Sequence, residues 1–245
     1  MHISVAERLA LAALVAAVPA DLVDAALDRA DHAAQRVRSL PPRVTVYHLL
    51  ASALYPSKGY DEVTALVWSV LPAATGRGLS RQLPSRGAIT RARQRLGCRP
   101  LQALLAEQLS TAVRGTPPSR VYLDKFDAGP DAQLWWLCDA VTEELRGCRL
   151  GGDIGTAAEL VAGAGPDAVV LCAPQDVPTG ALLDLLGRTV PVSRGELPGR
   201  VTVPWADLRA RTPAAWRQDA LARACVRAGA ETALQAPRHG RGPLA

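Results

Sequence analysis

LPPRVTVYHLLASALYPSKGYDEVTALVWSVLP, residues 40 to 72, sets the architecture of the first half of the chain. It opens with a Leu-Pro-Pro stop, after which residues 43–54 are almost all apolar. The β-branched residues at the start of this run are also compatible with a strand, but the apolar pattern continues to Leu54 and favours a buried helix. A turn at residues 55–59 leads into residues 60–71, which place apolar side chains on one helical side. Two consecutive helices are therefore predicted.

An arginine-rich stretch follows, RGLSRQLPSRGAITRARQRLGCR at residues 77–99, with seven arginines and no acidic residue. Ser85 can accept hydrogen bonds from the free backbone N–H groups that open a helix. Four apolar side chains then recur at helical spacing from Ala88 to Leu96, and Gly97 ends the helix. The stretch predicts a short amphipathic helix with an arginine-rich outer face.

This predicted helix suits a nucleic-acid groove, because packing of its apolar side leaves the arginines to point outward or sideways. Cationic side chains neutralise phosphates, and the guanidinium fork also hydrogen-bonds base edges. A solvated arginine face without a ligand is the alternative. The residues predicted to contact double-stranded DNA are Arg86, Arg91, Arg93 and Arg95 on the helix, Ser85 at its start, and Arg77, Arg81 and Arg99 as phosphate contacts.

The rest of the first half also reads as helical. Residues 4–17 and 20–38 form two helices separated by a proline, and residues 101–113 form the last of six. Together these elements predict an all-α domain over residues 1–115, with helix–turn–helix character at its end.

Charge is distributed unevenly along the 245 residues. Residues 1–119 hold 14 Arg or Lys against 8 Asp or Glu, whereas residues 120–245 hold 14 against 15. This asymmetry favours a polyanionic partner for the first half. With 49% hydrophobic and 21% charged residues, the composition is that of a globular protein and excludes wholesale disorder.

The second half follows a Gly- and Pro-containing linker at residues 115–119 and changes pattern. Its predicted strands cover residues 120–123, 149–150, 168–172, 190–193 and 201–203, and its predicted helices cover residues 131–145, 156–164, 179–186 and 213–228. This alternation predicts a small α/β domain over residues 120–236 with a mostly parallel sheet. Its helix–strand rhythm resembles that of flavodoxin-like folds. Residues 237–245 are predicted to be a disordered tail.

Residues 40–72, together with PSRGAITRARQRLGCRPLQALLAEQL at residues 84–109, closely resemble the N-terminal domain of insertion-sequence-four family transposases. The features that carry the match are, in order, Leu40-Pro41-x-Arg43, Gly59-Tyr60-x-Glu62-Val63 and Ala92-Arg93-x-Arg95-Leu96-Gly97. Residues 8–30 fit the same domain, so the resemblance covers residues 1–113. In that family this helical domain precedes the catalytic domain, and the resemblance implies recognition of transposon-end DNA.

The resemblance does not extend to the family's catalytic domain, which is ribonuclease-H-like and holds two divalent metals on three carboxylates. Such a core opens with three antiparallel strands, whereas a helix is predicted here after residues 120–123. Asp124 lies where the family's first catalytic aspartate falls. No second aspartate segment and no tyrosine–arginine–glutamate–lysine signature is recognisable. Asp124 is therefore interpreted as an ordinary strand-end acid, with a catalytic role as the alternative.

No other residue pattern in the sequence indicates a cofactor site. The five cysteines are scattered without zinc spacing, which is typical of a reducing cytoplasm. The apolar run at residues 9–18 is shorter than the roughly 20 residues of a membrane span. His48 is interpreted as a core histidine, and Trp135 and Trp136 as core or interface residues.

These observations predict a cytoplasmic, non-catalytic DNA-binding protein without a cofactor, derived from a truncated or domesticated transposase. Double-stranded DNA is the expected partner, self-association is possible, and no membrane is involved. One alternative is a residual DDE-type transposase or nuclease that uses Asp124 and Mg²⁺. The other is a protein–protein interaction module that does not bind DNA.

Overall fold

The computed structural model describes residues 3–32, 40–75, 82–112, 120–128, 132–165, 168–172, 192–193 and 212–235. The helices are α1 (Val5–Ala17), α2 (Ala20–Arg29), α3 (Pro42–Leu54), α4 (Tyr60–Thr75), α5 (Arg86–Leu96), α6 (Arg99–Ala112), α7 (Ile154–Ala162) and α9 (Pro213–Gln235). The strands are β1 (Arg120–Asp127), β2 (Gln133–Asp139), β3 (Leu145–Gly151), β4 (Val169–Cys172) and β5 (Val192–Ser193).

The all-helical first half is confirmed for the described residues. Helix α1 begins with a capping box, in which the Ser4 hydroxyl accepts from the Glu7 N–H and the Glu7 carboxylate accepts from the Ser4 N–H. The ambiguous run after the double proline is helix α3, and eight of its side chains are buried. Helix α2 ends at Arg29, nine residues before the predicted end; residues 33–38 of that prediction lie outside the described part.

The second half is an α/β unit, but its sheet is mixed rather than mostly parallel. The strand order is β3-β2-β1-β4-β5. Strands β1, β2 and β3 form an antiparallel meander; β4 pairs in parallel with β1, and β5 pairs in parallel with β4. The sheet therefore opens with three antiparallel strands, so the prediction of a helix after the first strand is wrong.

The sequence prediction was wrong at residues 131–145, which form β2, a turn and the start of β3 instead of a helix. Six of the seven residues of β2 are buried, so both faces of this strand are covered. A strand buried on both faces loses its period-2 alternation and cannot be told from a buried helix by periodicity. Glu143 in the turn has a φ of 60°, a left-handed conformation that a helix does not contain.

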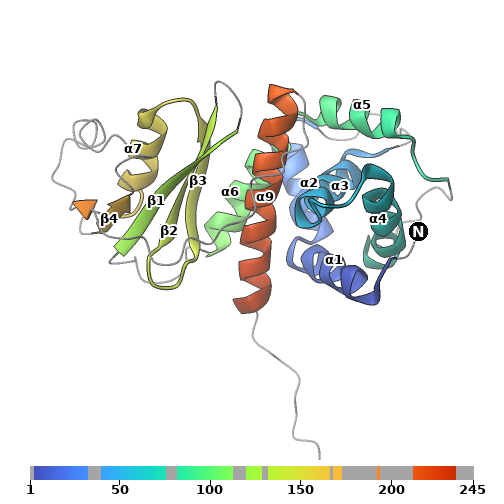
Figure 1. The fold of residues 1–245 in the computed structure, drawn as a ribbon, viewed down its shortest axis with the longest axis horizontal. Coiled ribbons are helices and arrows are strands. Elements are labelled where there is room, and N and C mark those ends of the chain that lie inside the picture. The colour runs from blue at the N-terminus through green and yellow to red at the C-terminus, as the bar shows by residue number, and fades with distance from the viewer. Residues whose placement is uncertain are drawn as a thin grey trace, which may run out of the picture.

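Helices cover both faces of the sheet (Figure 1). One face carries Val121 and Leu123 of β1, which pack with α7. The opposite face carries Tyr122 and Trp136, which share one core with α9 and the first-half helices. Helix α9 stands between the sheet and helices α1 to α5 in Figure 1, so this helix joins the two halves.

Within the described residues, no single helix is both long and apolar enough to cross a membrane; α1 and α2 pass that test only as a pair bent by 56°. The predictions for the linker, for residues 179–186 and 201–203 and for the tail lie outside the described part of the chain.

Candidate nucleic-acid interface

Helix α5 has the boundaries that its capping residues dictate. The Ser85 hydroxyl accepts from the Ala88 N–H at 3.2 Å, which confirms the predicted N-cap. Gly97 follows the last turn with a φ of 62°, a region that glycine enters without the steric cost of a Cβ atom. Ile89, Ala92 and Leu96 are buried, as predicted, so one face of the helix is fixed to the protein.

Three predicted contact residues lie free on the surface. Arg91 and Arg95 are exposed one turn apart on α5, and Arg99 is exposed at the start of α6. No carboxylate in the described ranges forms an ion pair with any of these three guanidinium groups. They therefore form a surface, here called the arginine face (Arg91, Arg95 and Arg99), whose positive charge is not cancelled by a described carboxylate.

Arg86 is exposed but already has an acidic partner. Its Nε lies 3.1 Å from both carboxylate oxygens of Asp61 on α4, and its terminal nitrogen Nη2 bonds Oδ2 as well. The guanidinium of Arg86 lowers the pKa of Asp61 by this hydrogen bonding. Asp61 therefore neutralises the N-terminal end of α5, while the arginine face lies towards its C-terminal end.

The prediction that Arg93 points outward is wrong. Arg93 is only 6% exposed, and its Nη2 lies 2.6 Å from the carboxylate of Asp219 on α9. Its Nη1 donates to the Tyr60 hydroxyl of α4. Burial raises the pKa of Asp219, and the Arg93 guanidinium partly offsets this effect. Arg93 thus links three helices and is not available to a ligand.

Helical geometry explains this burial. Residues three, four and seven positions after Ile89 share its face, and Arg93 is the residue at i+4. The same spacing puts Thr90 and Gln94 on the exposed side, next to the arginines. Charge counting missed both residues, whereas the helical spacing of the buried set was a signal that could have found them.

The exposed side of α5 can contact a duplex in two ways. The guanidinium groups can neutralise phosphates and release their counterions. The Gln94 amide and an arginine fork can both hydrogen-bond base edges in the major groove, which is wide enough to admit a helix. The Thr90 hydroxyl donates to the Arg86 carbonyl at 3.0 Å, so it offers a ligand only an acceptor. Arg77 and Arg81 lie outside the described residues.

Asp124 lies inside β1, opposite Trp136 of β2, and not at the strand end as predicted. It is 8% exposed, and its Oδ1 accepts from the Lys125 N–H at 2.8 Å. Within the described ranges, no group of three or more His, Cys, Asp or Glu side chains is placed to hold a metal ion. The described residues therefore do not fit the two-metal centre of a ribonuclease-H-like transposase.

Comparison with known proteins supports the resemblance of the helical half to a known family. Residues 8–106 match the family model described as insertion element 4 transposase N-terminal, which confirms the resemblance found in the sequence. No curated protein and no solved structure matches the chain. The matched segment contains α5 and the arginine face and ends inside α6. The sheet and α9 lie outside it.

Proposed function

We propose that this chain, whose residues 8–106 match the insertion element 4 transposase N-terminal domain, binds double-stranded DNA through α5 and does not cleave it. Residues Arg91, Arg95 and Arg99 contact phosphates, and Gln94 faces the base edges. Arg86 is a secondary contact, because an exposed ion pair such as Arg86–Asp61 contributes little and exchanges its partner readily.

The arginine face is the observation that carries this proposal. Arg91 and Arg95 are exposed on α5, whose opposite side is fixed by packing, and Arg99 is exposed at the start of α6; none of the three has an acidic partner among the described residues. Because the helix is already folded and packed, its backbone loses no additional conformational entropy when the arginine side chains bind a polyanion. The match to a transposase N-terminal domain supports the same partner independently.

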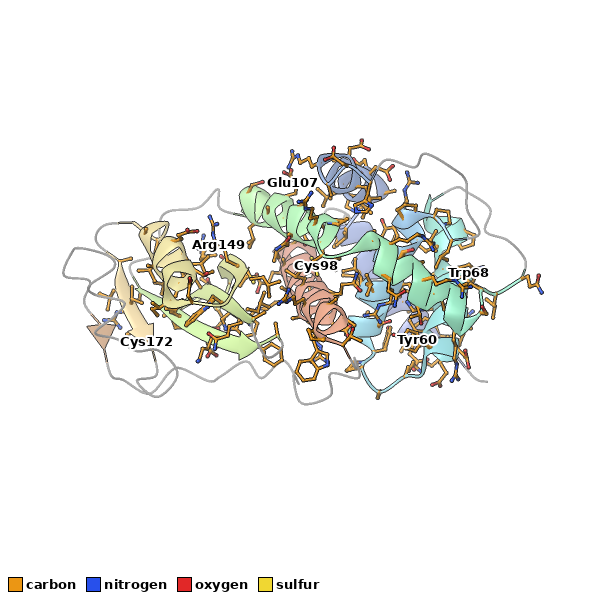
Figure 2. The ribbon with its side chains drawn as sticks, turned by 90° about the horizontal axis from the view of Figure 1, so that it is seen from above. Tyr60, Trp68, Cys98, Glu107, Arg149 and Cys172 are labelled. Carbon is orange, nitrogen blue, oxygen red and sulfur yellow. The ribbon has the colours of Figure 1, made fainter. Side chains whose placement is uncertain are left out.

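The double substitution Arg91→Ala/Arg95→Ala tests the proposal in the full chain. Titration of a fluorescent duplex at low salt should show binding by the wild type and an affinity lower by about tenfold or more for the variant, because two phosphate contacts are lost. The matched control is Arg120→Ala/Arg149→Ala, which removes two exposed arginines from the sheet. Arg149 lies in the sheet half of the molecule, away from Tyr60 and α5 (Figure 2).

The control should bind as the wild type does. Equal losses of duplex affinity in the two double variants would show that net charge alone accounts for the effect. An absence of duplex binding by the wild type would refute DNA binding. In the latter case light scattering with and without duplex distinguishes a protein–protein module.

A second candidate is a Mg²⁺-dependent nuclease that uses Asp124, because the sheet opens with three antiparallel strands and Asp124 lies on the first. The test is nicking of supercoiled DNA with and without Mg²⁺. Metal-dependent nicking that disappears in Asp124→Ala supports this candidate. We expect no nicking by either protein, because the described carboxylates do not converge.

A further inference from the structure

We infer that α9 completes the helical domain and that Gln218 and Asp219 on α9 are positioning residues for α5. This inference rests on the proposed DNA binding only for its functional consequence. The contacts themselves join segments about 120 residues apart in the sequence, and the matched segment 8–106 contains only one side of them.

Helix α9 has the burial of an interior helix. Ala220, Leu221, Ala222, Ala224 and Cys225 are each at most 1% exposed and belong to the core that contains the first-half helices. A helix with buried residues around most of its circumference lies inside a hydrophobic core, whereas a surface helix buries only one side. Helix α9 is therefore an interior helix.

The far part of α9 approaches α1 closely. A Cβ atom added to Gly229 would lie 2.9 Å from Cγ2 of Val18 and 3.2 Å from Cδ1 of Leu14. Only glycine permits this separation of the two helices without displacement of those side chains. The same core also contains Leu134, Trp136 and Leu145 of the sheet, so the buried surfaces of the two halves meet at α9.

Gln218 caps the C-terminal end of α5. Its Nε2 donates to the Arg93 carbonyl at 2.7 Å and to the Gly97 carbonyl at 2.8 Å. The Arg93 carbonyl also accepts from the Gly97 N–H at 3.1 Å, so Gln218 adds a second hydrogen bond there and provides a donor for the Gly97 carbonyl, which follows the last turn of α5. Gln218 is 4% exposed, so solvent does not replace its hydrogen bonds when they are lost.

Asp219 holds the C-terminal part of α5 by binding the Arg93 side chain. Its ion pair with Arg93 and the hydrogen bond from Arg93 to Tyr60 hold α5 between α9 and α4. Arg95 lies between Arg93 and Gly97, the two residues that Gln218 and Asp219 hold, and Arg99 follows Gly97 by two residues, so α9 determines where this part of the arginine face is presented. Positions of these cations matter because phosphate contacts set the register of a protein on a duplex.

A matched pair of glutamine substitutions tests the inference in the full chain. Gln108 on α6 is also buried, at 3%, and its Nε2 donates to the Cys225 carbonyl of α9 at 3.0 Å. Gln218→Met and Gln108→Met each remove a buried amide that bridges α9 and another helix, but only Gln218 contacts α5, where it donates two hydrogen bonds and accepts one from the Arg93 Nε at 3.5 Å. Methionine keeps the volume of the side chain and lacks the amide donor.

Two measurements are made on each variant. Hydrogen exchange is expected to be faster at the amides of the last turn of α5 and Gly97 in Gln218→Met and unchanged there in Gln108→Met. Duplex affinity is expected to fall about five- to tenfold in Gln218→Met and to stay unchanged in Gln108→Met. If Gln218→Met does not fold, Asp219→Asn replaces it, with the same expectations for α5.

Unchanged exchange at α5 in Gln218→Met, or an equal change in Gln108→Met, overturns the inference. Faster exchange with unchanged duplex affinity also overturns it, because α9 then does not position the DNA contacts. Failure of the wild type to bind duplex refutes the proposed function instead, and the exchange data still decide whether Gln218 positions α5.

Discussion

His48 shows at the residue scale how the helical half tolerates a buried titratable group. The ring is fully buried, stacks on Tyr60 with the ring centroids 5.9 Å apart, and has its Nε2 3.1 Å from the Thr64 hydroxyl. That hydroxyl donates to the Tyr60 carbonyl, so Nε2 is the protonated nitrogen that donates to it. Nδ1 has no hydrogen-bond partner among the described residues. His48 is therefore the core histidine that the sequence predicted.

His48 predicts a pH dependence of folding. Burial, aided by the nearby Arg93 charge, lowers the pKa of His48 from 6.5 to about 4. The unfolded chain then takes up a proton before the folded one, so the contribution is complete above pH 6.5 and decreases as pH falls towards 4. The decrease amounts to about 3 kcal/mol.

Urea unfolding of the wild type and His48→Gln at pH 7, 6 and 5 measures this effect. The free energy of unfolding should fall less steeply in the variant as the pH is lowered. Parallel pH profiles for the two proteins would contradict the assignment.

At the scale of elements, the two ion pairs of α5 should contribute differently to the free energy of unfolding. Asp219→Ala leaves the buried Arg93 charge unpaired and should lower the free energy of unfolding by about 3 kcal/mol or more. Asp61→Ala frees Arg86, whose side chain is 71% exposed, and should cost less than about 1 kcal/mol. Denaturant unfolding of both variants checks the contrast, which similar losses would contradict.

Most of the helices could be predicted from the sequence, because the features that start, stop and orient a helix lie within a few residues of it. Proline stops, the Ser85 cap and the apolar spacing of residues 43–54 all act within a few residues, and α3, α5 and α6 formed close to the predicted boundaries. The strand β2 was missed because both of its faces are buried, which removes the alternation that marks a strand. The partners Asp61 and Asp219 could not be predicted, since they come from distant parts of the chain.

The site was predicted in part for the same reason. The exposure of Arg91 and Arg95 follows from the position of the apolar stripe on one helix. The burial of Arg93 also follows from that stripe. A buried guanidinium needs a partner, however, and this partner is Asp219, which is distant in the sequence and lies beside Arg93 only in the folded protein.

At the scale of the whole molecule, α9 connects the arginine face to the sheet. Its Asp219 holds α5, whereas its Glu231 accepts from the Leu145 N–H of β3 at 2.9 Å and its Arg227 stacks over the Trp136 ring at 5.5 Å. The core that includes α9 continues from the helices to one face of the sheet. The two halves of the sequence are therefore one packed structure at this interface, and the family match over residues 8–106 covers only one side of it.

The salt dependence of duplex binding tests the central claim, that the three guanidinium groups of the arginine face, which form no ion pair with a described carboxylate, contact phosphates. The affinity of the wild type and of Arg91→Ala/Arg95→Ala/Arg99→Ala is measured over a series of salt concentrations. The slope of log affinity against log salt should be shallower in the variant by about three, one for each lost phosphate contact. Identical slopes for the two proteins would contradict the claim.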